Sequence, residues 1–338
     1  MKAEIPVKAL KKAAFFGGCR ETELVYAQGR FDKVARITDL YPHIVDLDHF
    51  AEHAAALRDV EVIFSTWNMP VLTPAHLDQL PALKIVFYAA GTVQYFASPF
   101  LERGITVVSA WKANAIPVAE FTASQIVLAM KGYFRNVREY RGCHDHRKTF
   151  VGIGNFGETV AILGAGAIGR RVIKLLHPYQ LRIVVFDPFL DPSDAARLGV
   201  EKVSLEEAFE KGYVVSNHIA NLPETHRMLN GALFQRMRPD ATFINTGRGI
   251  TVDEPSMLEV LGRRPDLSAL IDVTYPESPE PQSPLFTLPN VFLSSHIAGS
   301  MGDEVVRMAD YCIEEFMAWE KGRPLHYAIS LDMLKTMA

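Results

Sequence analysis

Residues 159–170 read Thr-Val-Ala-Ile-Leu-Gly-Ala-Gly-Ala-Ile-Gly-Arg, an apolar run that leads directly into the pattern G-x-G-x-x-G. A second apolar run, 181–186, follows the glycines and ends at Asp187. A strand, a glycine-rich turn, a helix and an acid about 20 residues further on are together typical of a dinucleotide-binding unit. This stretch therefore predicts a parallel α/β domain in which a helix begins just after the second glycine.

Each residue of this motif has a physical task. Gly164 permits the tight turn, Gly166 lets the backbone approach a pyrophosphate, and Gly169 allows close packing of the helix on the strand. The helix that opens at Ala167 points unpaired N–H groups toward the phosphates. Asp187 can accept both ribose hydroxyls and would repel a 2′-phosphate, which favours NAD over NADP. A methyltransferase can share this turn and acid, so the motif alone leaves the cofactor class open.

Length and composition narrow the class of protein. A chain of 338 residues is long enough for about two domains. Its formal net charge of −4, without a basic cluster, argues against nucleic acid as a partner. The uncharged run 85–101 is interrupted by Gly91, Gln94 and Pro99 and does not resemble a membrane span. Residues 1–12 lack the pattern of a signal peptide, and three widely spaced cysteines favour a reduced, cytoplasmic protein.

Strand-like runs alternate with helical stretches along the whole chain, which predicts parallel sheets covered by helices. In the first part the expected strands are 13–16, 37–39, 60–65, 85–89 and 106–108. In the second part the expected strands are 213–216, 241–245, 269–272 and 291–293, and the expected helices are 205–211, 231–236, 255–262 and 303–321. The chain is thus predicted to form two doubly wound α/β domains.

Two segments between these parts differ from the rest. Residues 118–130 are apolar on nearly all sides, which predicts a buried helix that either crosses between domains or lies at a dimer interface. Residues 133–156 are polar with little periodicity, and we expect an exposed connection. Within it, His144, Asp145 and His146 are expected to be solvated rather than to bind a metal, and no cluster of histidine and cysteine has metal-ligand spacing.

Three polar groups follow strands on the carboxyl side of the glycine motif, where ligands bind in an open α/β sheet. The run 243–249 ends in a turn that presents Arg248, the run 270–273 contains Asp272 and precedes Glu277, and the run 291–299 contains His296. Taken singly, Arg248 could be a surface charge, His296 a core histidine and Asp272 a strand-end cap. Together they predict a site that binds and reduces a 2-keto acid.

The chemistry of these residue types supports that prediction. A guanidinium can bind a substrate carboxylate through two hydrogen bonds and polarise the neighbouring carbonyl. An imidazolium can donate a proton to the developing alkoxide. A carboxylate beside the imidazole favours its charged form and fixes the orientation of the ring. NADH would supply the hydride.

These motifs, in this order, are similar to those of the D-isomer-specific 2-hydroxyacid dehydrogenase family: the glycine motif, Asn-x-x-Arg-Gly, Asp-Val followed by a glutamate, and a strand ending in His-Ile-Ala-Gly. The segment 114–129 resembles the family's helix with Val-Ala-Glu. The resemblance covers nearly the whole chain. It implies a Rossmann NAD-binding domain at 113–298 and a flavodoxin-like substrate domain at 1–112 and 299–338, completed by the C-terminal tail.

The resemblance also implies roles for individual residues. Arg248 would bind and polarise the substrate, His296 would be the acid/base, and Glu277 would pair with it. The residues that would contact NAD are Gly164, Gly166, Ala167, Ile168, Gly169, Asp187, Ile219, Thr225, Thr246, Gly247, Asp272, His296 and Gly299. The residues that would contact substrate are Ala90, Gly91, Thr92, Arg248 and His296. The family implies no metal, and a homodimer built on the cofactor domains.

This chain departs from the family pattern in several places. Ser295 and Ser278 replace prolines that usually precede the histidine and follow the glutamate, and Ala220 replaces another common proline. The loop after Gly91 has Val-Gln-Tyr at 93–95 in place of a second glycine and an aspartate, which leaves the size of the substrate open. Family regions that face the substrate correspond to Trp67, Tyr95 and Met301, which are equally well explained as ordinary packing.

We therefore expect an NAD-dependent oxidoreductase that interconverts a small 2-keto acid and its D-2-hydroxy acid. Hydroxypyruvate or glyoxylate is the first expectation, on the resemblance alone. The formate-oxidising branch is disfavoured, because its histidine pairs with glutamine and Glu277 is an acid. The alternative from another class is an NAD(H)-binding regulator, similar to the family's corepressor branch, with little or no turnover. A methyltransferase would require the grouping of Arg248, Glu277 and His296 to be accidental.

Overall fold

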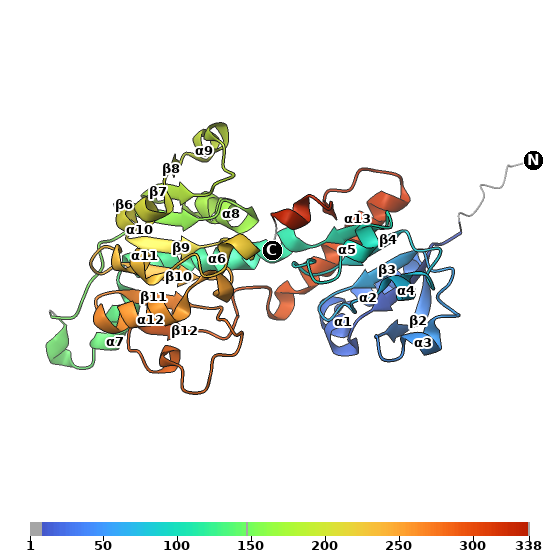
Figure 1. Ribbon diagram of the computed structural model, residues 1–338, viewed down its shortest axis with the longest axis horizontal. Coiled ribbons are helices and arrows are strands. Elements are labelled where there is room, and N and C mark those ends of the chain that lie inside the picture. Colours follow the sequence, from blue (N-terminus) through green and yellow to red (C-terminus); the bar gives the residue numbers. More distant parts are fainter. Residues whose placement is uncertain (1–8, 147, 337–338) are drawn as a thin grey trace, which may run out of the picture. The chain divides into compact units, whose positions relative to one another are not determined.

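The computed structural model describes residues 9–146 and 148–336. The chain divides into two compact units. Unit 1 joins Met1–Asn114 to Met301–Thr336, and unit 2 is Ala115–Ser300. Each unit is an α/β layer structure built on one sheet (Figure 1).

Unit 1 contains a six-stranded sheet in the order β13-β5-β4-β3-β1-β2, and only β13 runs antiparallel to its neighbour among the described strands. Buried aromatic rings that include Phe15, Phe64, Phe87 and Phe316 form much of its core. The strands are β1 (Lys12–Phe16), β2 (Asp39–Val45), β3 (Val62–Ser65), β4 (Ile85–Tyr88), β5 (Thr106–Ser109) and β13 (Ala328–Ile329). The helices are α1 (Cys19–Val25), α2 (Arg30–Ile37), α3 (Phe50–His53), α4 (Pro74–Leu77), α5 (Ser98–Leu101) and α13 (Val306–Glu320).

The second strand of unit 1 does not lie where the sequence predicts it. The prediction at 37–39 is wrong, because Ile37 ends α2 and the strand begins only at Asp39. This strand is at the edge of the sheet and several of its side chains are exposed, so it lacks a continuous apolar run. The last helix also differs: a 3-10 turn at Gly302–Glu304 precedes α13, which begins at Val306.

Unit 2 contains a seven-stranded parallel sheet in the order β12-β11-β10-β9-β6-β7-β8. Alternate residues of β6 face opposite cores: Val160 and Ile162 pack with α6, α8 and α9, whereas Ala161 and Leu163 pack with α10, α11 and α12. The strands are β6 (Phe156–Leu163), β7 (Gln180–Phe186), β8 (Glu201–Lys202), β9 (Val214–Asn217), β10 (Thr242–Asn245), β11 (Ser268–Ile271) and β12 (Val291–Leu293). The helices are α6 (Trp111–Met130), α7 (Tyr133–Glu139), α8 (Ala167–Leu176), α9 (Pro192–Leu198), α10 (Leu205–Lys211), α11 (Gly231–Gln235) and α12 (Glu254–Arg263).

Helix α6 is longer than the sequence predicts. The expected helix starts after Pro117, since proline is disfavoured inside helices, yet α6 starts at Trp111 and contains that proline. Its first residues belong to unit 1 and the remainder to unit 2. The helix therefore begins in one unit and continues in the other, as the first of the two alternatives predicts, and its place at a dimer interface stays a prediction.

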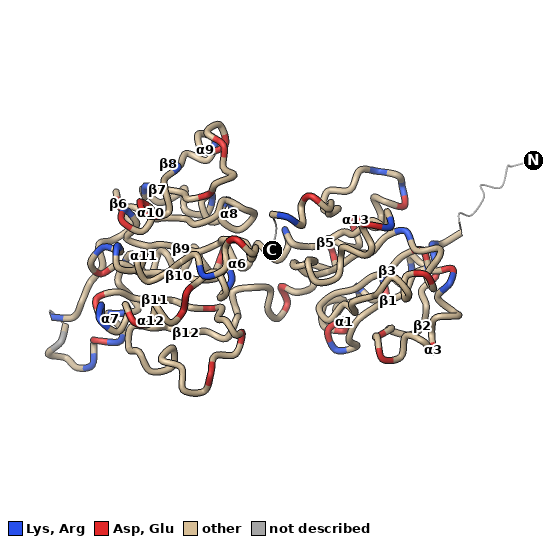
Figure 2. The backbone as a smooth tube through the Cα atoms, viewed as in Figure 1, with Lys and Arg blue, Asp and Glu red and all other residues tan. Residues whose placement is uncertain are grey.

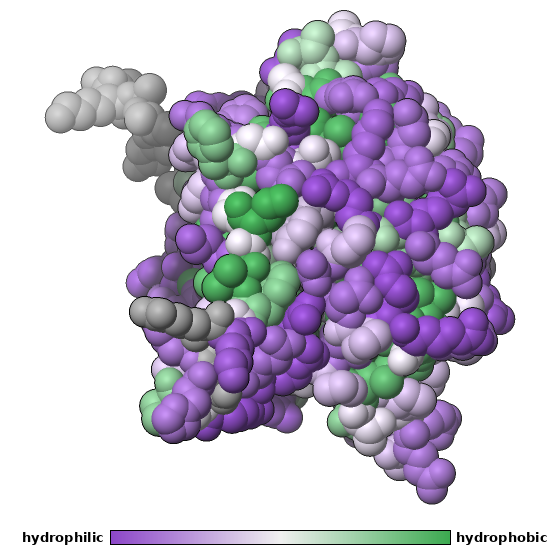
Figure 3. Space-filling model, turned by 90° about the vertical axis from the view of Figure 1, so that its left-hand side faces the viewer, coloured by the Kyte–Doolittle hydropathy of each residue, from purple (hydrophilic) through white to green (hydrophobic). Residues whose placement is uncertain are grey.

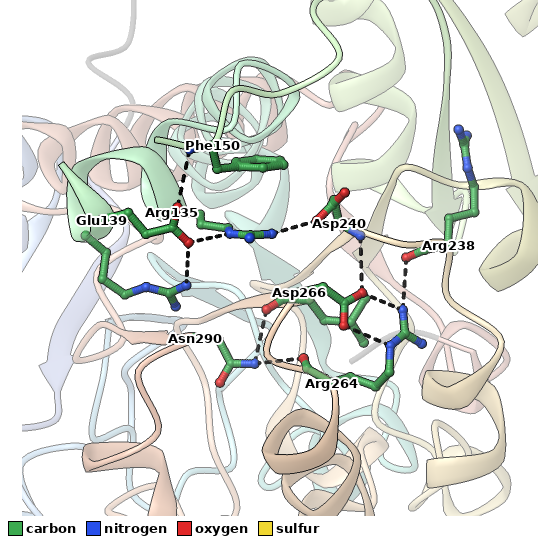
Figure 4. A network of polar contacts seen from close by, with 10 residues as sticks. Arg135, Glu139, Phe150, Arg238, Asp240, Arg264, Asp266 and Asn290 are labelled. Atoms are coloured by element: carbon green, nitrogen blue, oxygen red, sulfur yellow. Dashed lines mark hydrogen bonds and ion pairs between the residues drawn. The ribbon is translucent and has the colours of Figure 1, made fainter. Parts of the chain in front are cut away.

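The segment 133–156 is only partly the irregular connection expected from its sequence. Residues Tyr133–Glu139 form α7, and a 3-10 turn follows at Cys143–Asp145. Helix α7 has no fully buried residue, and its apolar residues Tyr133 and Val137 are exposed, so it lacks the buried face by which most helices are predicted. Packing of Phe134 against Phe292 and polar contacts around Arg135 (Figure 4) hold it to the rest of unit 2.

Lysine and arginine positions alternate with aspartate and glutamate positions along the described backbone of each unit (Figure 2). No described helix combines the length and the apolar character that crossing a membrane requires.

Candidate active site

The glycine motif adopts the conformation that its sequence predicts. Gly164 has a φ of +94°, and a Cβ there would lie 2.7 Å from the carbonyl oxygen of His218. A Cβ on Gly169 would lie 2.0 Å from the carbonyl oxygen of Gly164, so helix α8 can approach the turn only with glycine at this position. A Cβ on Gly166 would meet open space, which leaves room for a ligand phosphate beside the start of α8.

Asp187 lies beside this turn at the end of β7. Its Oδ2 accepts a hydrogen bond from the N–H of Ala165 at 2.7 Å, and its Oδ1 accepts from the N–H of Phe189 at 2.8 Å. The guanidinium of Arg170 donates to the carbonyl oxygen of Ala165 at 2.8 Å and also contacts Asp194. The peptide groups around Ala165 are therefore held from both sides. A carboxylate accepts about four hydrogen bonds, so Asp187 retains capacity for ribose hydroxyls.

The three chemical groups predicted from the sequence follow neighbouring strands. Strands β10, β11 and β12 are adjacent in the sheet and parallel, so their carboxyl ends meet at one edge. Arg248 follows β10, Asp272 follows β11, and His296 follows β12. The structure thus brings these groups to one edge of unit 2, the edge at which ligands bind in such sheets.

Glu277 pairs with His296. The imidazole Nδ1 lies 2.5 Å from Oε1 of Glu277, and the two side chains are 51% and 61% exposed. Both residues are therefore accessible to a small molecule. His296 has a φ of +58°, in the left-handed region that few residues other than glycine adopt.

Arg248 is partly buried beside this pair. Burial lowers the pKa of Arg248, and the negative charge of Glu277 opposes that shift, so the two residues interact electrostatically. Its Nη1 donates to the carbonyl oxygen of Gly247 at 2.8 Å, which orients the guanidinium. An arginine side chain in a protein still remains charged at neutral pH.

Gly249 brings the Arg248 turn against the loop that carries Glu277. A Cβ on Gly249 would lie 2.1 Å from both the carbonyl carbon and oxygen of Thr274. The hydroxyl of Thr274 donates to the carbonyl oxygens of Pro276 and Glu277, at 2.8 and 3.0 Å. This close backbone approach, possible only for glycine, sets the distance between the arginine turn and the glutamate loop.

A buried amide network beneath Arg248 was not singled out from the sequence. Asn217 donates to the side chains of Asn245 and Thr251 at 3.0 and 2.9 Å. Thr251 in turn donates to the carbonyl oxygen of Arg248 at 2.7 Å. The available sequence signal was an asparagine ending each of two buried strands, β9 and β10. The network connects the ends of β9 and β10 and, through Thr251, fixes the backbone of the turn that carries Arg248.

Asp272 is nearly buried, with 3% of its surface exposed. Its Oδ1 accepts hydrogen bonds from Ser294 Oγ at 2.6 Å and from the N–H of Ile297 at 2.9 Å. Its Oδ2 accepts from the N–H of Ala298 at 2.9 Å. The interpretation of Asp272 as a mere strand-end cap is therefore too narrow, because this carboxylate holds the loop on both sides of His296. Ser294 is a further residue that the sequence analysis did not single out.

Other residues expected at the cofactor lie in the same unit. Ala167 and Ile168 open helix α8, and Gly299 follows the His296 loop. Thr246 Oγ1 lies 2.8 Å from Thr122 Oγ1 of α6. The N–H of Ile219 donates to the side-chain oxygen of Asn217. The hydroxyl of Thr225 donates to the carbonyl oxygens of Ala220 and Leu222. A Cβ on Gly247 would lie 3.0 Å from the carbonyl oxygen of Asn217.

The residues expected to bind substrate through their backbone belong to unit 1. Ala90, Gly91 and Thr92 follow β4, and the hydroxyl of Ser109 donates to the carbonyl oxygens of Ala90 and Gly91 at 2.9 and 2.7 Å. These bonds turn the two carbonyl groups toward Ser109 and hold the loop in one shape.

The three hypothetical pocket residues also belong to unit 1. Tyr95 is 45% exposed, its hydroxyl lies 3.1 Å from that of the buried Tyr88, and Met301 is 52% exposed. Trp67 is partly buried. Among the residues that the structure describes, no group of three or more His, Cys, Asp or Glu side chains is arranged to hold a metal ion.

Comparison with known proteins gives a family match. The profile described as "D-isomer specific 2-hydroxyacid dehydrogenase, NAD binding domain" matches residues 124–298. The D-3-phosphoglycerate dehydrogenase of Archaeoglobus fulgidus is 28% identical over 234 residues, which are 69% of this chain but only 44% of that protein. The chain thus spans less than half the length of this relative.

Two further proteins match over a larger share of their length. The glyoxylate reductase of Korarchaeum cryptofilum is 28% identical over 284 residues, covering 82% of this chain and 85% of that protein. The crystal structure of the apo form of Rhodotorula graminis D-mandelate dehydrogenase superposes with a TM-score of 0.80 at 19% identity, covering 95% and 97% of the two chains. At that identity the likeness shows a shared fold.

Proposed function

Because this chain belongs to the D-isomer specific 2-hydroxyacid dehydrogenase family and contains its NAD-binding domain, we propose that it is an NAD-dependent enzyme that interconverts a small 2-keto acid and its D-2-hydroxy acid. The observation that carries this proposal is the pairing of His296 with Glu277 beside the partly buried Arg248, at the same sheet edge as the glycine motif. The open space at Gly166 and the free acceptor capacity of Asp187 suit the pyrophosphate and ribose of the cofactor.

The site residues divide the chemistry among them. Arg248 binds the carboxylate of the keto acid and polarises its carbonyl oxygen. His296 donates its proton from Nε2 to that oxygen, while Nδ1 remains held by Glu277. The glutamate stabilises the imidazolium and keeps the ring oriented. NADH, when bound, supplies the hydride that reaches the carbonyl carbon.

The loop formed by Ala90, Gly91 and Thr92 completes this proposal by binding the substrate carboxylate. Ser109 already engages the carbonyl oxygens of the first two residues, so their N–H groups are the polar backbone atoms that suit an anion. Small acids such as glyoxylate and hydroxypyruvate are the first substrates to test. A relative named glyoxylate reductase, which matches most of this chain, supports that choice.

Steady-state kinetics on purified protein would test the proposal. We expect NADH oxidation with at least one acid from a panel that includes glyoxylate, hydroxypyruvate and bulkier 2-keto acids, and slower oxidation of NADPH because Asp187 repels its phosphate. His296→Gln should lower kcat at least about 100-fold, as loss of a general acid does. His177→Gln, at an exposed position after α8, is the matched control.

The outcomes distinguish the enzyme from the regulator and from a methyltransferase. NADH binding without turnover on the whole panel would support the regulator and contradict the enzyme. Full activity in His296→Gln would contradict the assignment of the acid/base. Tight binding of S-adenosylmethionine instead of NADH would support a methyltransferase.

We also propose that the protein is a homodimer formed through unit 2. Backbone hydrogen bonds place residues 152–154 against the end of α6, beside α7. Apolar side chains gather in patches on the side of unit 2 where α7 lies (Figure 3). The exposed apolar residues of these segments are Leu128, Tyr133, Val137, Tyr140, Val151, Ile153 and Phe156. A second copy of the chain would cover them, since monomers rarely expose large apolar patches.

Light scattering coupled to gel filtration would test this assembly. Val137→Asp should produce a monomer, whereas Val71→Asp should leave a dimer, because both valines are 50% exposed but Val71 lies in unit 1. A monomeric wild type would contradict the proposal. Location in the cytoplasm is a further proposal, supported by three cysteines that are all free.

A further inference from the structure

The loop that carries His296 is attached to the end of the neighbouring strand by one carboxylate. Asp272 accepts hydrogen bonds from Ser294 on one side of the histidine and from the N–H groups of Ile297 and Ala298 on the other. The N–H of Ser294 also donates to the carbonyl oxygen of Ile271 at 2.9 Å. The loop is therefore anchored at both ends, and the histidine lies between the two anchors.

This anchoring matters because of the backbone conformation of His296. Its φ of +58° lies in the left-handed region, where a residue with a Cβ is disfavoured unless its surroundings impose that conformation. The imidazole reaches Glu277 from this conformation, at 2.5 Å between Nδ1 and Oε1. A change of φ to the ordinary negative range would redirect the side chain away from the glutamate.

We propose that the Ser294 hydroxyl, through its hydrogen bond to Asp272, is a positioning device that holds His296 in the left-handed conformation needed for proton transfer. The proposal rests on the proposed role of His296 as acid/base. It assigns Ser294 a function in turnover although its hydroxyl is bonded to Asp272 rather than to the imidazole. The geometry explains why the hydroxyl is needed, because its bond to the side chain of Asp272 is short, at 2.6 Å, and hydrogen bonds to a carboxylate are stronger than those between neutral groups.

Asp272 can perform this task and still serve the cofactor. Its three bonded donors leave acceptor capacity, because a carboxylate offers about four lone-pair sites. Replacement of Asp272 would therefore disturb two roles at once. Ser294 is the better position for a test, since its substitution removes one hydrogen bond and leaves the acid in place.

Ser294→Ala should lower kcat about 10-fold, because a small displacement of a catalytic group is costly for the chemical step, and KM and the affinity for NADH should change less than about twofold. Ser294→Thr keeps the hydroxyl and should restore kcat. Ser295→Ala, at the exposed neighbouring position, is the matched control and should behave as wild type.

A second readout does not depend on turnover. Amide hydrogen exchange at Ile297 and Ala298, measured by NMR or by mass spectrometry of short peptides, should be faster in Ser294→Ala than in wild type and in Ser294→Thr. If the wild type reduced no 2-keto acid but exchange responded in this way, the proposed function would fail while the anchoring stood. Unchanged exchange, or a Ser294→Ala enzyme with wild-type kcat, would overturn the inference.

Discussion

At the scale of single residues, Gly249 decides whether the site can assemble. It has no role in binding, yet it lets the arginine turn approach the backbone of Thr274, whose hydroxyl holds the glutamate loop. The chemistry of Arg248 and Glu277 thus depends on a neighbour that carries no functional group. The requirement for glycine at position 249 thus restricts the sequence as strictly as the requirement for a catalytic side chain does.

We expect Gly249→Ala to reduce both stability and activity. The added Cβ would overlap the Thr274 carbonyl group, and overpacking of this kind costs about 1–3 kcal/mol. Gly262→Ala is the control, because its Cβ would meet open space on helix α12 and should raise stability by about 0.5–1 kcal/mol. Urea denaturation of both variants measures their free energies of unfolding. A Gly249→Ala protein as stable as wild type would contradict the claim that only glycine fits against Thr274.

Sequence reasoning was effective for residues whose chemistry is carried by a local motif. The glycine turn adopts the predicted conformation, and the residue types Arg248, Glu277 and His296 meet at one place. It did not single out Asn217 or Ser294, because their partners are distant in the chain and become neighbours only once the strand order is known. Polar contacts between strand ends have no periodic signature.

At the scale of elements, α7 shows why one helix was missed. Short helices usually reveal themselves through an apolar stripe, and α7 buries no residue completely. Arg135 instead binds Glu139 and Asp240, both at 2.6 Å, and its guanidinium lies 4.3 Å from the centre of the Phe150 ring (Figure 4). The same cluster continues from Asp240 to Asp266 and Arg264. These polar contacts supplement the apolar contact that Phe134 makes with Phe292.

Arg135→Ala should therefore destabilise unit 2 locally. Loss of this partly buried cation would break two ion pairs and the aromatic contact, at a cost of about 2 kcal/mol. Arg263→Ala removes an exposed ion pair with Glu259 and should cost less than about 0.5 kcal/mol. Hydrogen exchange in residues 133–139 should rise in the first variant alone, and equal exchange in both would contradict this account of α7.

At the scale of the whole molecule, the carboxylates of unit 2 make its stability depend on pH. Glu158 has a pKa lowered chiefly by its hydrogen bond to Arg238, and Asp266 has one lowered chiefly by Arg264. A carboxyl group whose pKa is lower when folded stabilises the protein above its unfolded pKa, about 4, and loses that contribution as the pH falls. The urea midpoint should thus fall from pH 6 to pH 3.5, and less steeply in Glu158→Gln. An identical pH dependence in that variant would contradict the attribution.

The general architecture could be predicted from the sequence because strand-like apolar runs alternate with helical stretches along the chain. Two parallel-dominated sheets with helices follow from that pattern and are observed. The edge strand β2 and the start of α6 were misplaced, because solvent exposure weakens the first signal and Pro117 obscures the second. Errors at this scale thus lie at edges and boundaries, away from the strand ends that carry the chemistry.

The most direct test of the central claim is the transfer of deuterium from [4,4-²H₂]NADH to a 2-keto acid, followed by mass spectrometry and chiral separation of the product. The account predicts deuterium at C2 of the D-2-hydroxy acid with wild-type protein, and almost none with His296→Gln although that variant still binds NADH. A product labelled in the L form, or undiminished labelling in the variant, would contradict it.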